Sequence, residues 1–68
     1  MKEIKIRDEY IKLGQLLKLA GMVDSGVEAK IEISDGNVLL NGNIEKQRGK
    51  KVFSGDTVTF RGEEIKVL

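Results

Sequence analysis

The chain has 68 residues, enough for one small domain and too few for two, so a single core has to stabilise the whole fold. It contains no cysteine and no histidine, which excludes disulfide bonds, thiolate chemistry and nearly every zinc, haem or iron–sulfur site. Its 12 lysines and arginines against 11 aspartates and glutamates give a net charge of +1, so a nucleic-acid-binding surface would depend on how the charges are distributed.

Residues 3–7 are predicted to form the first strand. Polar and apolar side chains alternate along this segment, which is the period of a half-buried strand. Ile4 and Ile6 would then face the core.

A first helix is predicted over residues 10–20. Asp8 is placed to serve as its N-cap, and Gly21 follows the last apolar residue, where a glycine commonly ends a helix. The core side of this helix is a stripe with offsets of 0, 3, 4 and 7, formed by Leu13, Leu16, Leu17 and Ala20. Leu19 lies on another face beside polar residues, and packing beneath a neighbouring element is the simplest explanation for it.

A second helix is predicted to begin after Ser25. Ser25 and Glu28 fit a capping box, in which the serine hydroxyl accepts from the Glu28 amide and the carboxylate reaches back to the Ser25 amide. Residues 30–34 also alternate as a strand would, so periodicity alone leaves a strand open. The cap, together with Asp35-Gly36, where glycine can adopt the left-handed conformation that closes a helix, favours the helix.

After residue 37 the sequence changes to short strands separated by turns. We expect strands at 38–40, 52–53, 57–60 and 65–67. The turn signals between them are Asn41-Gly42, Ser54-Gly55-Asp56 and Arg61-Gly62-Glu63. Ile65 and Val67 alternate as the first strand does, so we expect the last strand to pair with the first and hold both termini in one sheet.

Positive charge is concentrated in one segment. Residues 46–51 carry four cations and no acid, whereas residues 1–34 carry six charges of each sign. The four cations are Lys46, Arg48, Lys50 and Lys51. Clustered cations gain affinity for closely spaced phosphates through the release of counterions, so this segment is a candidate phosphate-binding surface.

Many ordinary residues occur in an order that resembles a known family. They are Lys12-Leu13, Leu17, Gly21-Met22, Ser25, Ala29, Ile33, Gly36-Asn37-Val38, Leu40-Asn41-Gly42 and Gly55-Asp56. This order resembles the consensus of the S-four family, the RNA-binding domains of the ribosomal small-subunit protein four type, over about residues 10–60. Residues 11–21 resemble a similarly placed segment of free-standing bacterial proteins of the YaaA/YbcJ type.

The resemblance implies an α+β fold with an alpha-L RNA-binding motif, in which two short helices pack on a small, bent, mostly antiparallel sheet. It also implies that structured RNA, often ribosomal, binds to the helices and the following hairpin. Lys12, Ser25, Asn41 and Gly42 match family positions, and Lys46, Arg48, Lys50 and Lys51 occupy the variable basic loop. Lys18 and Lys30 would extend the positive surface across the helices if the loop lies beside them.

Two positions depart from the family pattern. Gly14 replaces the usual aspartate after Leu13, and Gly26 replaces the usual arginine after Ser25. An arginine at position 26 would offer a planar fork to a phosphate, whereas glycine offers only its amide. Binding would then depend on the helix N-terminus and on residues 46–51. Base stacking is not expected, because the three aromatic residues are few and resemble core residues: Tyr10, Phe53 and Phe60.

Each candidate also has a purely structural interpretation. Residues 46–51 could be a solvated hairpin tip that keeps a sheet edge soluble, and single lysines are commonly surface residues without a ligand. Ser25 is first a helix cap, and Asn41-Gly42 is first a turn. The alternative function is a protein-interaction adaptor that uses the exposed sheet or Leu19 and does not bind RNA.

Catalysis is not expected from this set of residues. Without histidine or cysteine, the remaining candidates are carboxylates that have better local roles as caps or turn residues, and the chain has no glycine-rich phosphate-binding motif. No cofactor is expected. No apolar run approaches the roughly 18 residues of a membrane span, so we expect a cytoplasmic protein. We also expect a monomer and a single domain over residues 1–68.

Overall fold

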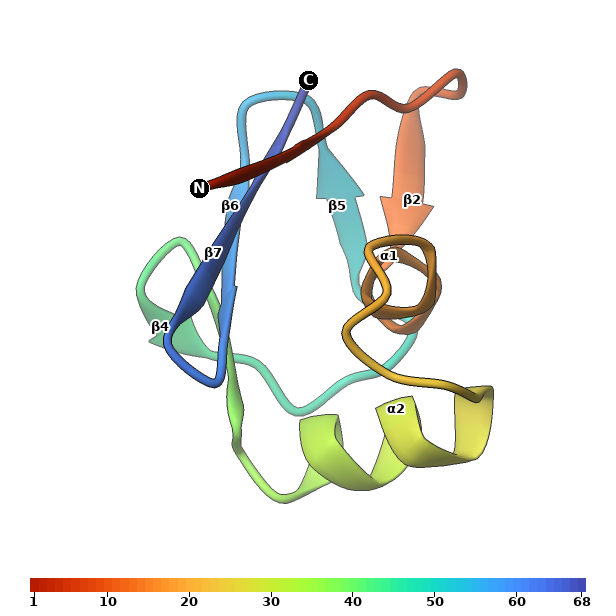
Figure 1. The fold of residues 1–68 in the computed structure, drawn as a ribbon, viewed down its shortest axis with the longest axis vertical. Coiled ribbons are helices and arrows are strands. Elements are labelled where there is room, and N and C mark those ends of the chain that lie inside the picture. Colours follow the sequence, from red (N-terminus) through yellow and green to blue (C-terminus); the bar gives the residue numbers. More distant parts are fainter.

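The computed structural model describes all residues, 1–68, and is α+β, with two short helices and two small sheets (Figure 1). The helices are α1 (Leu13–Leu19) and α2 (Gly26–Ser34). The strands are β1 (Lys2–Ile4), β2 (Tyr10–Lys12), β3 (Val38–Leu40), β4 (Asn43–Ile44), β5 (Lys51–Phe53), β6 (Thr57–Phe60) and β7 (Glu63–Val67). Neither helix has the length and apolar character needed to cross a bilayer.

The larger sheet has the strand order β1-β7-β6-β3-β4 and is antiparallel except for the pair of β1 with β7. The expected pairing of the first and last strands is confirmed, and it is parallel, with Ile4 opposite Val67. β1 ends at Ile4, earlier than predicted. Ile6 lies beyond this strand, where its amide donates to the carbonyl of Leu68 and its side chain packs, partly buried, against the core.

The prediction for residues 10–12 was wrong. These residues form β2, which pairs with β5 so that Ile11 lies opposite Val52, and α1 begins only at Leu13. Asp8 is exposed and does not cap the helix. The partner strand forty residues away outweighs the helical periodicity, as tertiary pairing commonly does for aromatic and β-branched residues. The predicted apolar stripe of α1 is nevertheless buried along its whole length: Leu13, Leu16, Leu17 and Ala20.

The second helix is confirmed, with one change at its cap. The Ser25 hydroxyl accepts from the Glu28 amide at 3.1 Å, but the Glu28 carboxylate accepts from the amide of Asp24 rather than that of Ser25. Only Ala29 and Ile33 reach the core. The helix therefore contacts the rest of the protein along a single narrow stripe.

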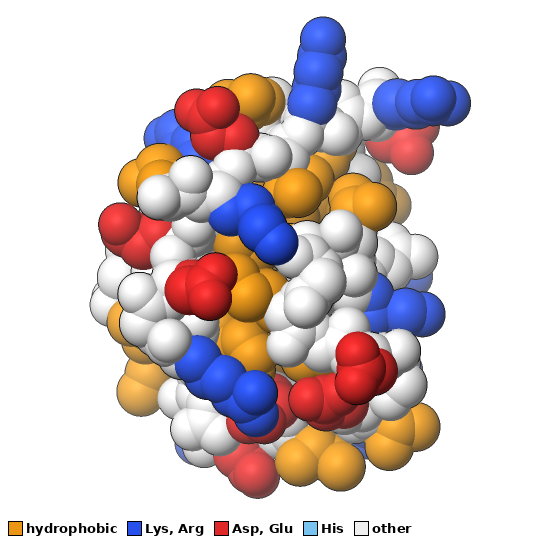
Figure 2. Space-filling view, in the orientation of Figure 1, with side chains coloured by type: hydrophobic (Ala, Val, Ile, Leu, Met, Phe, Trp, Pro, Cys, Tyr) orange, Lys and Arg blue, Asp and Glu red, His pale blue; other side chains and the backbone are white.

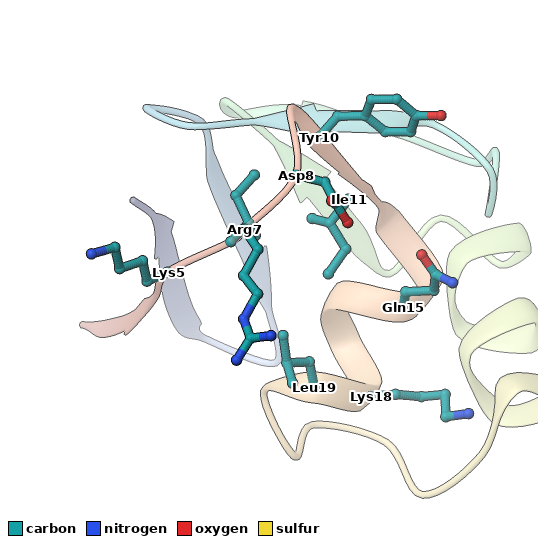
Figure 3. A pocket seen from close by; sticks show the side chains of 9 residues that line it. Lys5, Arg7, Asp8, Tyr10, Ile11, Gln15, Lys18 and Leu19 are labelled. Atoms are coloured by element: carbon teal, nitrogen blue, oxygen red, sulfur yellow. The ribbon is translucent and has the colours of Figure 1, made fainter.

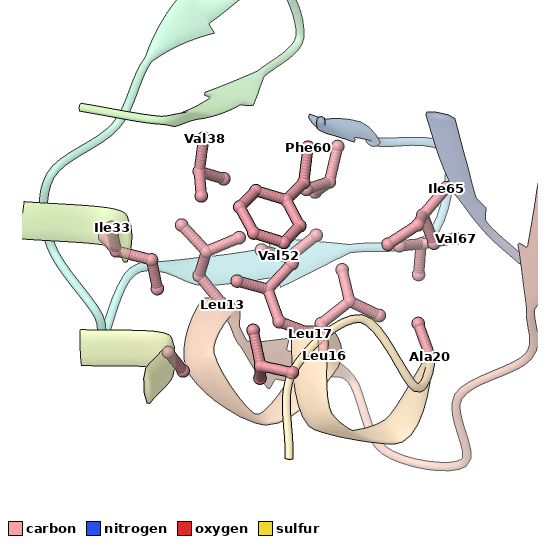
Figure 4. Close-up of a cluster of buried hydrophobic side chains, with 13 residues drawn as sticks. Leu13, Leu16, Leu17, Ala20, Ile33, Val38, Val52, Phe60, Ile65 and Val67 are labelled. Atoms are coloured by element: carbon pink, nitrogen blue, oxygen red, sulfur yellow. The ribbon is translucent and has the colours of Figure 1, made fainter. Parts of the chain in front are cut away.

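The core lies between the helices and β5 on one side and the larger sheet on the other (Figure 4). Its 13 buried residues are all apolar, and no buried polar side chain lacks a partner. Phe60 is the largest of them, whereas Phe53 is 42% exposed. The expectation that all three aromatic residues belong to the core is therefore wrong for Phe53 and for Tyr10, which is half-buried outside the 13 core residues.

The end of α2 is attached to the larger sheet by Glu32. Its carboxylate accepts from the Asn37 side chain and pairs with Arg61 in the turn between β6 and β7. These contacts, first the hydrogen bond from Asn37 and then Arg61, lower the pKa of Glu32 below its ordinary value. This is the single salt bridge of the protein.

Two leucines of α1 provide a direct test of the core. Leu16→Ala removes a completely buried side chain and should lower the free energy of unfolding by about 2–5 kcal/mol. Leu19→Ala makes the same chemical change on the same helix at a side chain that is 60% exposed, and it should change stability by no more than about 0.5 kcal/mol. Urea denaturation of the two variants measures the difference, and equal losses would contradict this packing.

Candidate functional site

A polar hollow of about 320 Å³ lies where the start of α1, the start of α2 and the segment before β5 meet. Three of the predicted cations line it, and it has no apolar lining residue and no acid. The lining residues are Lys12, Gly14, Gln15, Lys18, Gly26, Arg48 and Gly49. The fold thus brings together charges from positions 12, 18 and 48 at one place.

Backbone hydrogen bonds hold the basic segment against α1. The first helix has no side-chain cap, and the amides of Leu13 and Gly14 donate to the carbonyls of Lys50 and Arg48 at 2.9 and 3.0 Å. These are amides that a helix start otherwise leaves without partners. The segment carrying Arg48 therefore has a fixed position beside the helix that carries Lys12 and Lys18.

Gly14 permits a close approach at this junction. A Cβ atom at position 14 would lie 2.6 Å from Cγ and 3.2 Å from Cδ of Arg48, so the arginine stem occupies the space that a side chain would need. A glycine inside the first turn of a helix costs stability relative to alanine, and such a cost commonly marks a packing reason. Gly14, where the S-four resemblance leads us to expect an aspartate, therefore lies at the place where the stem of Arg48 packs.

Lys51 adds a fourth charge beside the hollow. It lies directly opposite Lys12 in the pairing of β2 with β5, and its ammonium group is 4.8 Å from the centre of the Tyr10 ring. Like charges directly opposite each other on antiparallel strands destabilise the pair unless an anion offsets them. We refer to Lys12, Lys18, Arg48 and Lys51 as the basic surface.

None of these four cations is paired with an acid, because the one salt bridge joins Arg61 to Glu32. On the face drawn in Figure 2, cationic and acidic side chains are interspersed. The net charge of the protein is +1, and the basic surface differs from the rest in that three of its cations converge on one hollow that no acid lines.

The remaining predicted residues lie around or away from the hollow. Lys30 is one helical turn beyond Gly26 and on the same face of α2, which extends the positive surface along that helix. Ser25 caps the helix whose first residue, Gly26, lines the hollow. Lys50 is exposed, and its carbonyl holds the Leu13 amide.

Lys46, Asn41 and Gly42 do not line the hollow. The stem of Lys46 passes Gly36, just beyond the end of α2 and about a helix length away from the hollow at its start. Asn41 and Gly42 have φ of +51° and +86° and form the two-residue turn between β3 and β4. The Asn41 side chain donates to Asp56 and accepts from the Thr57 amide, so its polar atoms already have partners.

Residues 46–51 do not form a hairpin loop, contrary to the expectation. They connect β4 in the larger sheet to β5, which pairs with β2 in the smaller one. The sequence signals for turns were correct, but no local signal shows that the two flanking strands join different sheets. The same crossing brings Arg48 to α1, and without it the basic segment would be remote from Lys12.

Comparison with known proteins gives the family. A family model described as S4 domain matches residues 4–68. The chain belongs to the S4 domain family. The S-four resemblance seen in the sequence is thereby confirmed.

Two relatives of this S4 domain are similar over most of their length. The protein YbcJ of Escherichia coli (strain K12) is 39% identical over 59 residues, which are 87% of this chain and 84% of YbcJ. The Bacillus subtilis (strain 168) protein named Probable ribosome maturation protein RlbA is 44% identical over 59 residues, which are 87% of this chain and 83% of RlbA.

The solution structure of Escherichia coli YbcJ has the same fold. It superposes with a TM-score of 0.77 at 35% identity and covers 100% of this chain and 87% of YbcJ. That structure is described as revealing an alpha-L motif involved in RNA binding. The α+β fold and the alpha-L arrangement expected for this S4 domain are therefore confirmed.

A double-mutant cycle tests the contact between Gly14 and Arg48. In the Arg48→Ala background the Cγ and Cδ atoms are gone, so Gly14→Ala should stabilise the protein by up to ~1 kcal/mol through helix propensity. In the native background the same change has to displace the arginine stem, and the two effects should differ by at least ~0.5 kcal/mol. Urea denaturation of the four proteins measures this coupling, and an equal effect of Gly14→Ala in both backgrounds would contradict the close approach.

Proposed function

We propose that this S4 domain binds structured RNA through the basic surface and that its RNA is ribosomal. The observation that carries the proposal is the convergence of Lys12, Lys18 and Arg48 on one hollow that no acid lines. Charge held in this way can neutralise neighbouring phosphates without first breaking ion pairs inside the protein.

The polar hollow suits phosphate groups because every lining side chain is polar or absent. At the start of α2, Gly26 offers its backbone amide to a phosphate at the position where the S-four resemblance leads us to expect an arginine. Lys30 continues the positive surface along that helix. Ser25 acts by capping α2, and Asn41-Gly42 by shaping the β3–β4 turn, so both support the surface indirectly. Lys50 contributes at its margin, and Lys46, which lies beside Gly36 about a helix length away, would meet a more distant phosphate of the same RNA.

The relatives support the choice of ligand. YbcJ is described as having a motif involved in RNA binding, and RlbA is named for ribosome maturation. Neither name describes a catalytic activity. The proposal is therefore a binding module acting in the cytoplasm on ribosomal RNA or an assembling ribosomal subunit, as a monomer and without a cofactor or a catalytic step.

Salt dependence tests the basic surface. Lys12→Gln combined with Arg48→Gln should weaken binding to a short structured RNA and reduce the slope of log affinity against log salt by about 1–2, at roughly 0.7–0.9 per lost phosphate contact. The matched control is Lys2→Gln combined with Lys66→Gln, which removes the same charge from the edge strand β1 and its neighbour β7. Fluorescence anisotropy at several salt concentrations measures both slopes. An unchanged slope in the first variant would place the interface elsewhere.

Crosslinking in living cells tests the class of RNA. Ultraviolet crosslinking followed by sequencing of the attached RNA should enrich ribosomal RNA fragments, and the double variant Lys12→Gln with Arg48→Gln should lose them while the control variant keeps them. A stoichiometric protein partner that survives nuclease and high salt, with no enriched RNA, would favour the adaptor alternative instead.

A further inference from the structure

A second and larger hollow of about 660 Å³ lies between the segment that follows β1, the strand β2 and the exposed side of α1 (Figure 3). Its wall is apolar, with Ile6, Ile11 and Leu19. Its rim carries three cations, Lys5, Arg7 and Lys18, and one acid, Asp8. In Figure 3, Arg7 extends toward Leu19, and the Tyr10 ring lies at the far edge.

Of the apolar wall residues, Leu19 has no cover within the protein, whereas Ile6 and Ile11 are partly buried against the core. Leu19 is 60% exposed, although Leu16 and Leu17 on the same helix are completely buried. The expectation that Leu19 packs beneath a neighbouring element is therefore wrong, because the neighbouring segment, residues 5–8, stands off from α1 and leaves the hollow open. A leucine in this position offers contact area to a ligand.

The polar side chains of the rim also have unused hydrogen-bonding capacity. Lys5, Arg7, Asp8, Gln15 and Lys18 make no side-chain hydrogen bond or ion pair within the protein. Three positive charges against one negative charge favour an anionic ligand. A cationic protein segment would be repelled by this rim.

The two hollows adjoin each other. Gln15 and Lys18 line both of them, so a ligand whose phosphates occupy the basic surface continues directly into the larger hollow. The volume of about 660 Å³ falls in the range of about 300–1,000 Å³ that is typical of sites for small organic groups. Proteins that read RNA by its bases mostly bind nucleotides that are unpaired and turned out of a helix.

We propose that the larger hollow receives the base of an unpaired nucleotide in the bound RNA. The base contacts Ile11 and Leu19 with its apolar faces, Asp8 and Gln15 are placed to hydrogen-bond its polar edge, and the neighbouring phosphates meet Arg7 and Lys18. This inference rests on the proposed function and adds to it the kind of RNA: a structured RNA with a bulged or looped nucleotide next to a paired segment. An uninterrupted duplex has no base available to fill the hollow.

Three short RNAs test the inference: a blunt-ended duplex, the same duplex with one bulged adenosine, and the bulged duplex with an abasic ribose in place of that adenosine. The native protein should bind the adenosine bulge on the order of tenfold more tightly than the other two, because only its base can cover the apolar wall and remove that surface from water. The abasic RNA shows whether the base itself is responsible, because it keeps the flexibility of the bulge.

Two variants assign the preference to the hollow. Leu19→Gln keeps the length of an exposed side chain but removes its apolar contact, so it should abolish the preference for the adenosine bulge and leave binding of the blunt duplex unchanged. Ile31→Gln is the matched control, since Ile31 is 54% exposed on α2 and does not line the hollow; it should keep the preference.

The outcomes separate this inference from the proposed function. Equal binding of all three RNAs by the native protein would contradict the proposal that a base occupies the larger hollow. It would leave the proposal of RNA binding by the basic surface intact. A preference that Leu19→Gln does not change would also overturn it. Failure to bind any of the RNAs would remove the proposed function, and with it the inference. A nuclease-resistant protein complex that Leu19→Gln disrupts would show that a protein segment occupies the hollow instead.

Discussion

The amides at the start of α1 donate to the carbonyls of Lys50 and Arg48, and the arrangement of the basic surface depends on these two hydrogen bonds. A helix start without a side-chain cap needs other acceptors, and here the segment before β5 provides them. The pairing of β2 with β5 continues the same contact, and buried Leu13 and Val52 lie beneath it. Because the acceptors are backbone atoms, the side chains of this segment remain free to face solvent.

Glycine at position 14 has two consequences at that junction. It leaves room for the stem of Arg48, which a Cβ atom would meet at 2.6 Å, and it keeps any side chain, such as the aspartate expected here from the S-four resemblance, out of the polar hollow. An aspartate in the first turn would interact favourably with the helix dipole but would also neutralise part of the neighbouring charge. Glycine lacks this interaction with the dipole and also lowers helix propensity by up to ~1 kcal/mol relative to alanine. In return, Arg48 stays unpaired beside the hollow.

Local patterns predicted the elements whose structure is decided locally. The apolar stripe of α1, the Ser25 cap of α2 and the Asn41-Gly42 turn each have a sequence signal within a few residues, and the structure has them. Residues 10–12 were misassigned because their partner, β5, is forty residues away and nothing in the segment itself indicates it. The path of residues 46–51 between two sheets depends on the same distant pairing. The candidate cations could therefore be identified from the sequence. The sequence could not show which of them lie together in the folded protein.

The two hollows would make different contributions to RNA recognition, one to affinity and the other to discrimination between RNAs. Contacts to phosphates provide affinity for any sequence, and the polar hollow, with its cations and without an apolar side chain, is suited only to that. An apolar wall discriminates between RNAs only if a base is available to cover it, and the larger hollow has such a wall at Leu19 and Ile11. Lys18 belongs to both and lies in the last turn of α1, where a cation also interacts favourably with the helix dipole. A change at Lys18 would thus alter affinity, base preference and helix stability together, whereas Leu19 and Arg48 each act on one hollow alone.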